Sequence, residues 1–145
     1  MDSTDRFLRW NPIPSDGVYH GPTHGRGTLA TTPLILVCGG RDFDDPSKMY
    51  DVLDSQFDKG CILLQGDALG ADRLALEWAQ MNRVWYVGVP AAWEKNGKAA
   101  GLIRNNQMLD LAPIKVIAFP TKKSRGTWHT IKGAKARGIE TVVID

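Results

Sequence analysis

Apolar and polar positions follow two periodicities from Pro33 to the C-terminus. Short apolar runs of strand length recur at five places: 34–38, 61–65, 84–90, 114–120 and 139–145. Between them, apolar residues return at helical spacing within four longer segments: 45–60, 73–82, 97–112 and 126–138. Asp45 and Pro46 are suited to begin the first helix, and Gly60 is suited to end it. The pattern therefore predicts strands and helices in strict alternation.

This alternation determines the expected fold class. Strands separated by helices pair in parallel through right-handed crossovers, and the helices cover both faces of the sheet. We expect an α/β fold with a doubly wound, mostly parallel five-stranded sheet over residues 33–145. Residues 1–32 show neither period and are rich in Pro, Gly, Thr and His, which predicts an irregular N-terminal arm. His20 and His24 in this arm have no carboxylate or thiol to complete a ligand set, so we assign no metal site.

Composition limits the class of protein. A chain of 145 residues, 43% of them hydrophobic, suffices for one domain with one core. No apolar run approaches the roughly 18 residues of a membrane span, and the first residues lack the regions of a secretion signal. Cys38 and Cys61 lie inside predicted strands without CxxC spacing, which favours buried free thiols over a disulfide. We expect a soluble cytoplasmic protein with no membrane partner.

The distribution of charge is informative in one segment of the chain. The formal net charge of +2 is too small to indicate a nucleic-acid-binding protein by itself. Positive charge is concentrated in residues 121–137, which contain six Lys and Arg residues and no acidic residue. This segment follows the fourth strand and contains the start of the fourth helix, from where it can face an anion.

Glycine-rich turns follow three of the predicted strands. The first, in the stretch LVCGGRDFDDP, places Gly39 and Gly40 where a ligand can approach the backbone, with Arg41 able to fork onto a phosphate or carboxylate. It lacks the third glycine of a dinucleotide fingerprint, and no P-loop motif occurs, so no cofactor is expected. An equally acceptable alternative is that Arg41 pairs with Asp42 or Asp44 on the surface.

The other two glycine turns supply further candidates. The turn QGDALGAD offers three for ligand binding: Gly66, Asp67 and Gly70. Asp72 in the same turn is better explained as a helix cap or as a complement to the helix dipole. In FPTKKSRGTWHT, Gly126 and Thr127 open a helix whose free backbone N–H groups are suited to an anion. Thr127 as a plain N-cap is an alternative that remains compatible with phosphate binding.

The segment PAAWEKNGKAAGLIRNN, between the third strand and the third helix, contributes two more candidates. Trp93 is suited to stack on a bound base or, equally, to anchor the loop on the domain. Arg104 is six residues from Asp110, the wrong spacing for an ion pair on one helix face, so we expect its guanidinium to point into the crevice. Because the turns of a doubly wound sheet converge at one edge, a phosphorylated small molecule is the expected occupant.

Four blocks of the sequence resemble a known family. VCGGRDFDD, GDALGADRLALEWA, PAAWEKNGKAAGLIRNNQML and VIAFPTKKSRGT, in this order, look like the YspA-like branch of the SLOG superfamily. The superfamily includes the lonely-guy (LOG) phosphoribohydrolases and the DprA/Smf proteins, and the resemblance covers roughly Pro33 to Asp145. It implies a Rossmann-like fold that binds nucleotides or nucleotide-derived ligands, and a homo-oligomer with pockets near the subunit contacts.

The resemblance to the lonely-guy enzymes is incomplete at their catalytic blocks. Arg104 and Met108 match the R-K-x-x-M block, with Asn105 in place of the lysine. The P-G-G-x-G-T-x-x-E block matches only at three positions, Pro120, Gly126 and Thr127. Thr130 stands where the family carries its glutamate, and threonine cannot act as a carboxylate base. The resemblance therefore favours binding over hydrolysis.

Three functions stay open at this point. The favoured one is a binding protein that senses or sequesters a signalling nucleotide, such as a cyclic nucleotide or an ADP-ribose derivative. The second is a phosphoribohydrolase that cleaves the N-glycosidic bond of nucleoside monophosphates, supported by Arg104 and the turn 126–127. The third is single-stranded nucleic-acid binding of the DprA kind, which only the basic segment 121–137 supports.

Overall fold

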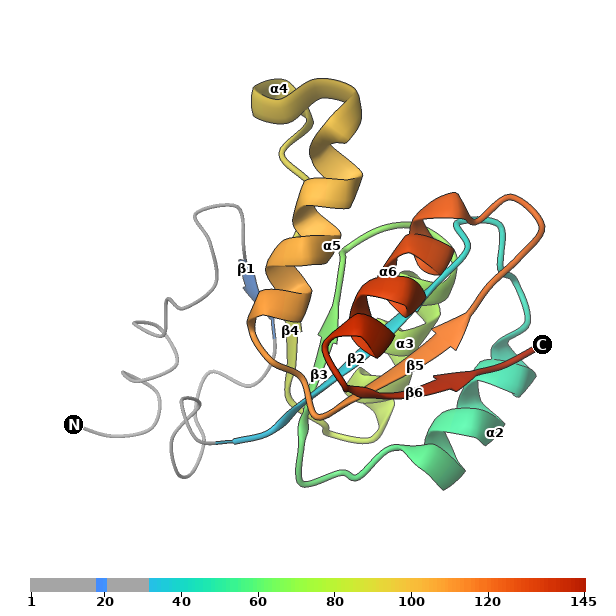
Figure 1. The fold of residues 1–145 in the computed structure, drawn as a ribbon. Helices are drawn as coiled ribbons and strands as arrows, with labels where there is room; N and C mark the ends of the chain where they lie inside the picture. The colour runs from blue at the N-terminus through green and yellow to red at the C-terminus, as the bar shows by residue number, and fades with distance from the viewer. Residues whose placement is uncertain (1–17, 21–31) are drawn as a thin grey trace.

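One sheet organises the structure, a computed structural model that describes residues 18–20 and 32–145. Its strands lie in the order β1-β4-β3-β2-β5-β6. They are β1 (Val18–His20), β2 (Leu34–Gly39), β3 (Ile62–Gln65), β4 (Tyr86–Gly88), β5 (Lys115–Phe119) and β6 (Glu140–Val143). Strands β2 to β6 are parallel, which confirms the expected five-stranded parallel sheet (Figure 1).

Strand β1 is a sixth strand that the periodicity does not predict. It pairs antiparallel with β4 at the sheet edge, with Val18 opposite Gly88 and His20 opposite Tyr86. It belongs to the arm expected over 1–32, of which residues 1–17 and 21–31, including His24, lie outside the described residues. A run of three residues is too short to show a period of two, so tertiary pairing and not local pattern defines this strand.

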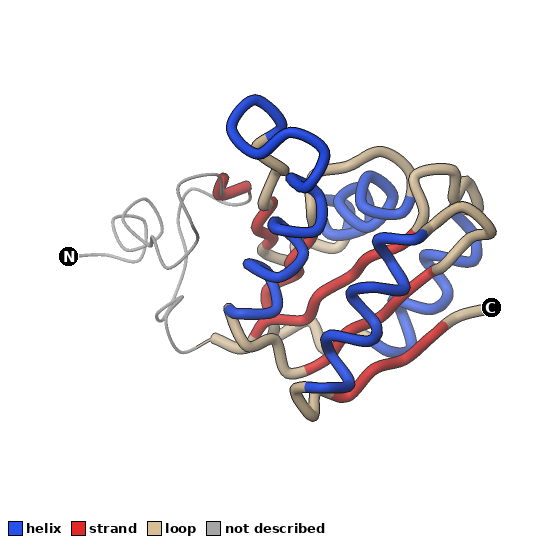
Figure 2. The backbone as a smooth tube through the Cα atoms, turned by 45° about the horizontal axis from the view of Figure 1, so that its top comes forward, coloured by secondary structure: helices blue, strands red, loops and turns tan. Residues whose placement is uncertain are grey.

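Helices lie on both faces of the sheet, as a doubly wound fold requires (Figure 2). They are α2 (Pro46–Gln56), α3 (Ala71–Met81), α4 (Trp93–Asn96), α5 (Ala100–Asp110) and α6 (Arg125–Ala136), with a 3-10 turn over Gly97–Ala99. α2 and α3 pack on one face, whereas α5 and α6 pack on the other. No helix in the described ranges is long and apolar enough to cross a membrane.

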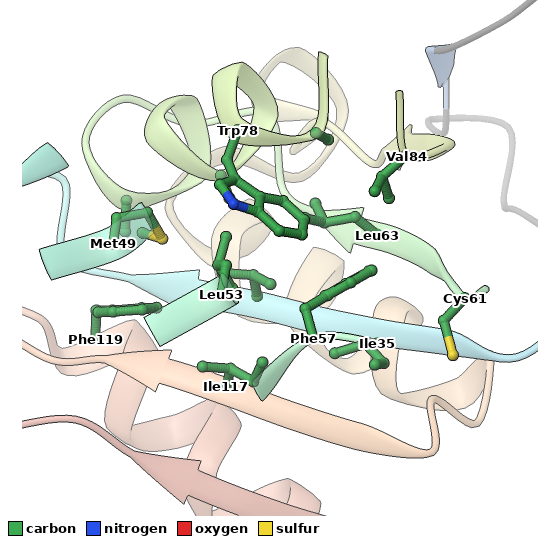
Figure 3. Packing of buried hydrophobic residues seen from close by; sticks show 14 residues of the cluster. Ile35, Met49, Leu53, Phe57, Cys61, Leu63, Trp78, Val84, Ile117 and Phe119 are labelled. Carbon is green, nitrogen blue, oxygen red and sulfur yellow. The ribbon is translucent and has the colours of Figure 1, made fainter. Parts of the chain in front are cut away.

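Strand β2 divides the core into two layers because its successive side chains point to opposite faces. Leu34 and Leu36 pack in the cluster under α5 and α6. Ile35 and Val37 pack in the cluster under α2 and α3, part of which Figure 3 shows. A strand that is apolar at every position is therefore buried on both faces, as the continuous run 34–38 predicts.

The second core layer contains a buried tryptophan. Trp78 is 1% exposed, packs edge-on against Phe57, and donates from Nε1 to Asp54 at 2.9 Å. Its polar nitrogen is thus satisfied at the boundary of the layer. Cys38 and Cys61 are buried free thiols, which confirms their assignment from the sequence.

The strand order sets the position of the ligand crevice. From β2 the chain moves outward through β3 to β4 and then crosses back to form β5 on the other side of β2. The helices that follow β2 and β5, which are α2 and α6, leave toward opposite faces. A crevice therefore opens between the carboxyl ends of these two strands, the usual ligand position in such sheets.

Candidate functional site

Two adjoining pockets occupy this edge of the sheet. The larger, here called the switch-point pocket, measures about 500 Å3 and is lined by the turn after β2, the start of α6 and one side of α5. The smaller, here called the side pocket, measures about 350 Å3 and is lined by the turn after β3 and the loop after β4. Both are lined by the same four residues: Arg41, Ala68, Trp93 and Arg104. They therefore form one crevice with two compartments.

Nine of the ten residues predicted to bind a ligand line this crevice. Four line the switch-point pocket alone: Gly39, Gly40, Gly126 and Thr127. Two line the side pocket alone: Gly66 and Asp67. Three line both: Arg41, Trp93 and Arg104. The convergence of turns that lie far apart in the sequence agrees with the topology, although ligand contact itself stays a prediction.

Gly70, the tenth candidate, lines neither pocket and instead joins the turns after β2 and β3. It is the N-cap of α3 with a φ of 76°, and a Cβ there would lie 2.3 Å from the Gly40 carbonyl oxygen and 2.4 Å from that of Arg41. The next amide, of Ala71, donates to the Gly40 carbonyl at 3.1 Å. Only glycine tolerates both this φ and this approach, so Gly70 positions the wall of the switch-point pocket.

Arg41 stands at the junction of the two pockets. Its guanidinium carbon lies 5.3 Å from the centroid of the Trp93 ring, a cation–π arrangement. Asp42, one of the alternative ion-pair partners, accepts a hydrogen bond from the Thr121 hydroxyl at 2.5 Å. Trp93 is 49% exposed, so its ring is open to the crevice as well as to Arg41. A charged group and an aromatic face are thus offered together at the pocket mouth.

The start of α6 forms an anion-binding end of the switch-point pocket. Ser124 is the N-cap, so Arg125, Gly126 and Thr127 are the first three helical residues, and their N–H groups have no acceptor within the helix. The alternative that Thr127 is the N-cap is therefore wrong, because Ser124 takes that place one turn earlier. Free N–H groups and the helix dipole together favour a negatively charged ligand at this point.

Asn105 and Thr130 fix this first turn from two helices. Both donate to the Gly126 carbonyl, Asn105 from Nδ2 at 3.3 Å and Thr130 from its hydroxyl at 3.0 Å. Asn105 also accepts from Nε of Arg104 at 2.8 Å. The asparagine that replaces the lonely-guy lysine thus connects Arg104 to the anion-binding turn.

Arg104 is a buried cation held by carbonyl and amide oxygens. Besides Asn105, its Nη1 donates to the Gly66 carbonyl and to that of Val89 at 3.3 Å. The side chain is 8% exposed, and this burial lowers its pKa, while the charge of Asp72 opposes the shift. Arg104 therefore links the turn after β3, the end of β4 and α5 at the floor of the crevice.

Asp72, which the sequence favours as a helix cap or dipole complement, is a further candidate for the site. Its Oδ2 accepts from the amides of Gly66 at 3.0 Å and Ala68 at 3.2 Å, so the side chain folds the turn after β3 and does not cap α3. It is 6% exposed and lines the switch-point pocket. Burial raises the pKa of Asp72 to about 6, although Arg104 and the two amide hydrogen bonds oppose the rise.

The raised pKa of Asp72 predicts a pH-dependent stability. Because the folded state holds the proton up to about pH 6 and the unfolded chain releases it near 3.8, the free energy of unfolding falls as pH rises between these values. Asp72→Asn does not titrate, so we expect its stability relative to the parent protein to increase by about 2–3 kcal/mol from pH 4 to pH 7. Guanidinium chloride unfolding at several pH values measures this; parallel pH profiles would contradict it.

Charge in the switch-point pocket is predominantly positive. Five cationic side chains line it, Arg41, Lys98, Arg104, Lys123 and Arg125, against the two carboxylates of Asp42 and Asp72. The basic segment 121–137, singled out from the sequence, supplies two of the five. Lys98 was not predicted, because its position depends on how the 3-10 turn before α5 is folded.

A solved structure supports the fold assignment. DNA processing protein A (DprA) from Streptococcus pneumoniae matches 98% of this chain with a TM-score of 0.67 and 16% sequence identity. The match spans 65% of the DprA chain. At this identity, the likeness establishes a shared Rossmann-like α/β fold.

Sequence comparisons identify the family. Residues 33–96 match the YspA, cpYpsA-related SLOG family (YAcAr), and these residues contain the turns after β2 and β3. The Gene 61 protein of Mycobacterium phage D29 is 32% identical over 116 residues, and the match covers 74% of this chain and 93% of the phage protein. On these matches and on its fold, the chain belongs to the YspA, cpYpsA-related SLOG family.

Proposed function

We propose that this protein binds a phosphorylated, nucleotide-derived small molecule in the switch-point pocket. The observation that carries the proposal is the meeting of the free N–H groups of α6 with five cationic side chains around a cavity of about 500 Å3. A phosphate at this position gains backbone hydrogen bonds, the helix dipole and an excess of positive charge. The volume lies within the range of small-molecule sites.

The side pocket supports a ligand with a planar, partly apolar portion. Leu69, Pro90 and Trp93 contribute apolar surface to it, and the Trp93 ring stands at its boundary with the switch-point pocket. A nucleobase stacked on this ring would join a phosphate at α6 to the second compartment. Signalling nucleotides, including cyclic nucleotides and ADP-ribose derivatives, have both chemical parts.

Thr130 supports binding over turnover. Thr130 lines the pocket, and its hydroxyl donates to the Gly126 carbonyl at 3.0 Å. A hydroxyl cannot replace the carboxylate base that hydrolysis would need at this position. One observation favours the alternative phosphoribohydrolase activity, namely that Asp72 supplies a carboxyl group to the same pocket with a pKa near 6. Release of free base from nucleoside monophosphates would establish that alternative.

Calorimetry with a nucleotide panel, together with native mass spectrometry of the protein purified from cells, tests the proposal. The panel contains AMP, cyclic nucleotides, ADP-ribose and a single-stranded oligonucleotide. We expect a bound nucleotide recovered intact, and the mass also tests the homo-oligomer implied by the family. Binding of the oligonucleotide alone, with strong salt dependence, would instead favour the nucleic-acid alternative, to which the exposed Lys122 and Lys123 would contribute.

Charge removal at the anion-binding end gives a direct prediction. We expect Lys123→Ala and Arg125→Ala each to weaken nucleotide binding by about tenfold, because each removes a charge-assisted contact worth about 1.4 kcal/mol. Lys132→Ala is the matched control, since Lys132 is exposed on α6, as Arg125 is, and lines neither pocket. Titration calorimetry measures all three; equal effects of the three substitutions would mean that general charge, not this pocket, attracts the ligand.

A further inference from the structure

Two polar atoms at the floor of the switch-point pocket are left without partners. Both hydrogen bonds of Asp72 end on Oδ2, and those of Arg104 start from Nε and Nη1. Within the described part of the chain, Oδ1 of Asp72 and Nη2 of Arg104 therefore make no hydrogen bond. Both side chains are more than nine-tenths buried and both line the pocket.

Neither free atom is sealed from solvent, and both side chains line the pocket. Among the described residues, the buried side-chain atoms that are both sealed from solvent and unpartnered lie elsewhere, on Gln107 and His129. Asp72 and Arg104 also lie against the same residue, because a Cβ on Gly66 would be 2.5 Å from Arg104 Nη1 and 2.9 Å from Asp72 Oδ2. The two side chains therefore meet at Gly66, and each contributes one free atom, an acceptor on Asp72 and a donor on Arg104.

The chemistry of this pair selects the group that it can bind. A hydroxyl donates to a carboxylate and accepts from a guanidinium at the same time, so it satisfies both atoms. A phosphate or carboxylate would satisfy Arg104 but would be repelled by Asp72, and an amino group could not accept from Arg104. Leaving either buried atom unpaired costs more than the bond itself is worth, so the pair discriminates strongly against a ligand without a hydroxyl.

We propose that Asp72 and Arg104 hold a ribose hydroxyl and make the pocket selective for ribonucleotides over their deoxy counterparts. The inference rests on the proposed function, because it assigns the sugar to the floor between the phosphate at α6 and the aromatic face of Trp93. Asp72 is thereby a specificity-determining residue, whose Oδ2 orders the turn after β3 while its Oδ1 contacts the ligand.

The test compares matched ligands on the full-length protein at pH 7.5. AMP and ADP-ribose are titrated beside 2′-deoxy-AMP, 3′-deoxy-AMP and 2′-deoxy-ADP-ribose. We expect removal of at least one of the two hydroxyls to weaken binding by tenfold or more. In Asp72→Asn the amide oxygen keeps the bonds to Gly66 and Ala68 while an NH2 group replaces the free oxygen, so discrimination should fall below threefold.

The remaining outcomes separate this inference from the proposed function. Asp51 is an exposed carboxylate on α2 that lines neither pocket, so Asp51→Asn should leave the discrimination between ribo and deoxy ligands unchanged. Equal binding of ribo and deoxy ligands by the parent protein would overturn the inference and leave nucleotide binding standing. No binding of any of these nucleotides would overturn the proposed function together with it. If a folded Asp72→Asn protein discriminates between ribo and deoxy ligands as the parent does, Asp72 does not bind the ribose hydroxyl.

Discussion

Arg104→Leu is expected to lower the free energy of unfolding by about 3–5 kcal/mol at pH 7 and to abolish nucleotide binding. The substitution leaves the carbonyls of Gly66 and Val89 without their donor and leaves Asp72 as a buried carboxylate without a compensating charge. Removing a buried cation beside a buried carboxyl group is costly, because the carboxylate then stays desolvated without a neighbouring positive charge. Urea unfolding followed by circular dichroism measures the loss.

A double-mutant cycle with Asp72→Asn identifies the cause of that loss. If the uncompensated carboxylate is the main cost, the double variant should be more stable than Arg104→Leu alone, with a coupling energy of about 1–3 kcal/mol. Arg137→Leu is the control, because Arg137 bonds Asp110 at 2.7 Å on the surface, and such pairs contribute less than about 1 kcal/mol. Equal losses of unfolding free energy in Arg104→Leu and Arg137→Leu would show that the buried contacts of Arg104 stabilise the fold no more than a surface ion pair does.

The fold could be predicted because its determinants are local. Every strand from β2 to β6 contains a continuous apolar run, and the helices between them keep one apolar face, so the alternation could be read directly. The boundaries moved where tertiary contacts decide: the strand expected over 84–90 is reduced to Tyr86–Gly88, and the helix expected over 97–112 begins with a 3-10 turn. β1 could not be read at all, since only its pairing with β4 defines it.

The candidate site was predictable as far as topology fixes it. Glycine turns after β2 and β3 and the start of α6 had to meet at one edge, and they do. Asp72 does lie in the first turn of α3, where a carboxylate complements the helix dipole, but its second role in the turn after β3 could not be read from the sequence. Only the folded turn shows that the amides of Gly66 and Ala68 bond its side chain. Gly70, also predicted to bind the ligand, lines neither pocket and joins the turns after β2 and β3, while its contact with a ligand stays a prediction.

Gly70→Ala is expected to destabilise the fold by about 4 kcal/mol, the sum of a backbone strain and a steric overlap. With φ 76° and ψ −124°, the backbone of Gly70 lies in a region that residues other than glycine rarely adopt, at a cost of about 1–3 kcal/mol. The new Cβ would in addition lie 2.3–2.5 Å from the backbone of Gly40 and Arg41, where overpacking costs about 1–3 kcal/mol and the neighbouring atoms cannot rotate away. The turn after β2 would have to move, and the pocket wall would move with it.

Gly138→Ala is a control that introduces a side chain at positive φ without a steric overlap. Gly138 has a φ of 73°, close to the 76° of Gly70, but a Cβ there would meet nothing within 4 Å. The control should therefore lose only the strain, about 1–2 kcal/mol, and keep nucleotide affinity, whereas Gly70→Ala should lose at least about 2 kcal/mol more. Chemical unfolding and nucleotide titration of both variants measure the difference. Equal losses would mean that the turns after β2 and β3 adjust freely, and that Gly70 does not fix the wall of the switch-point pocket.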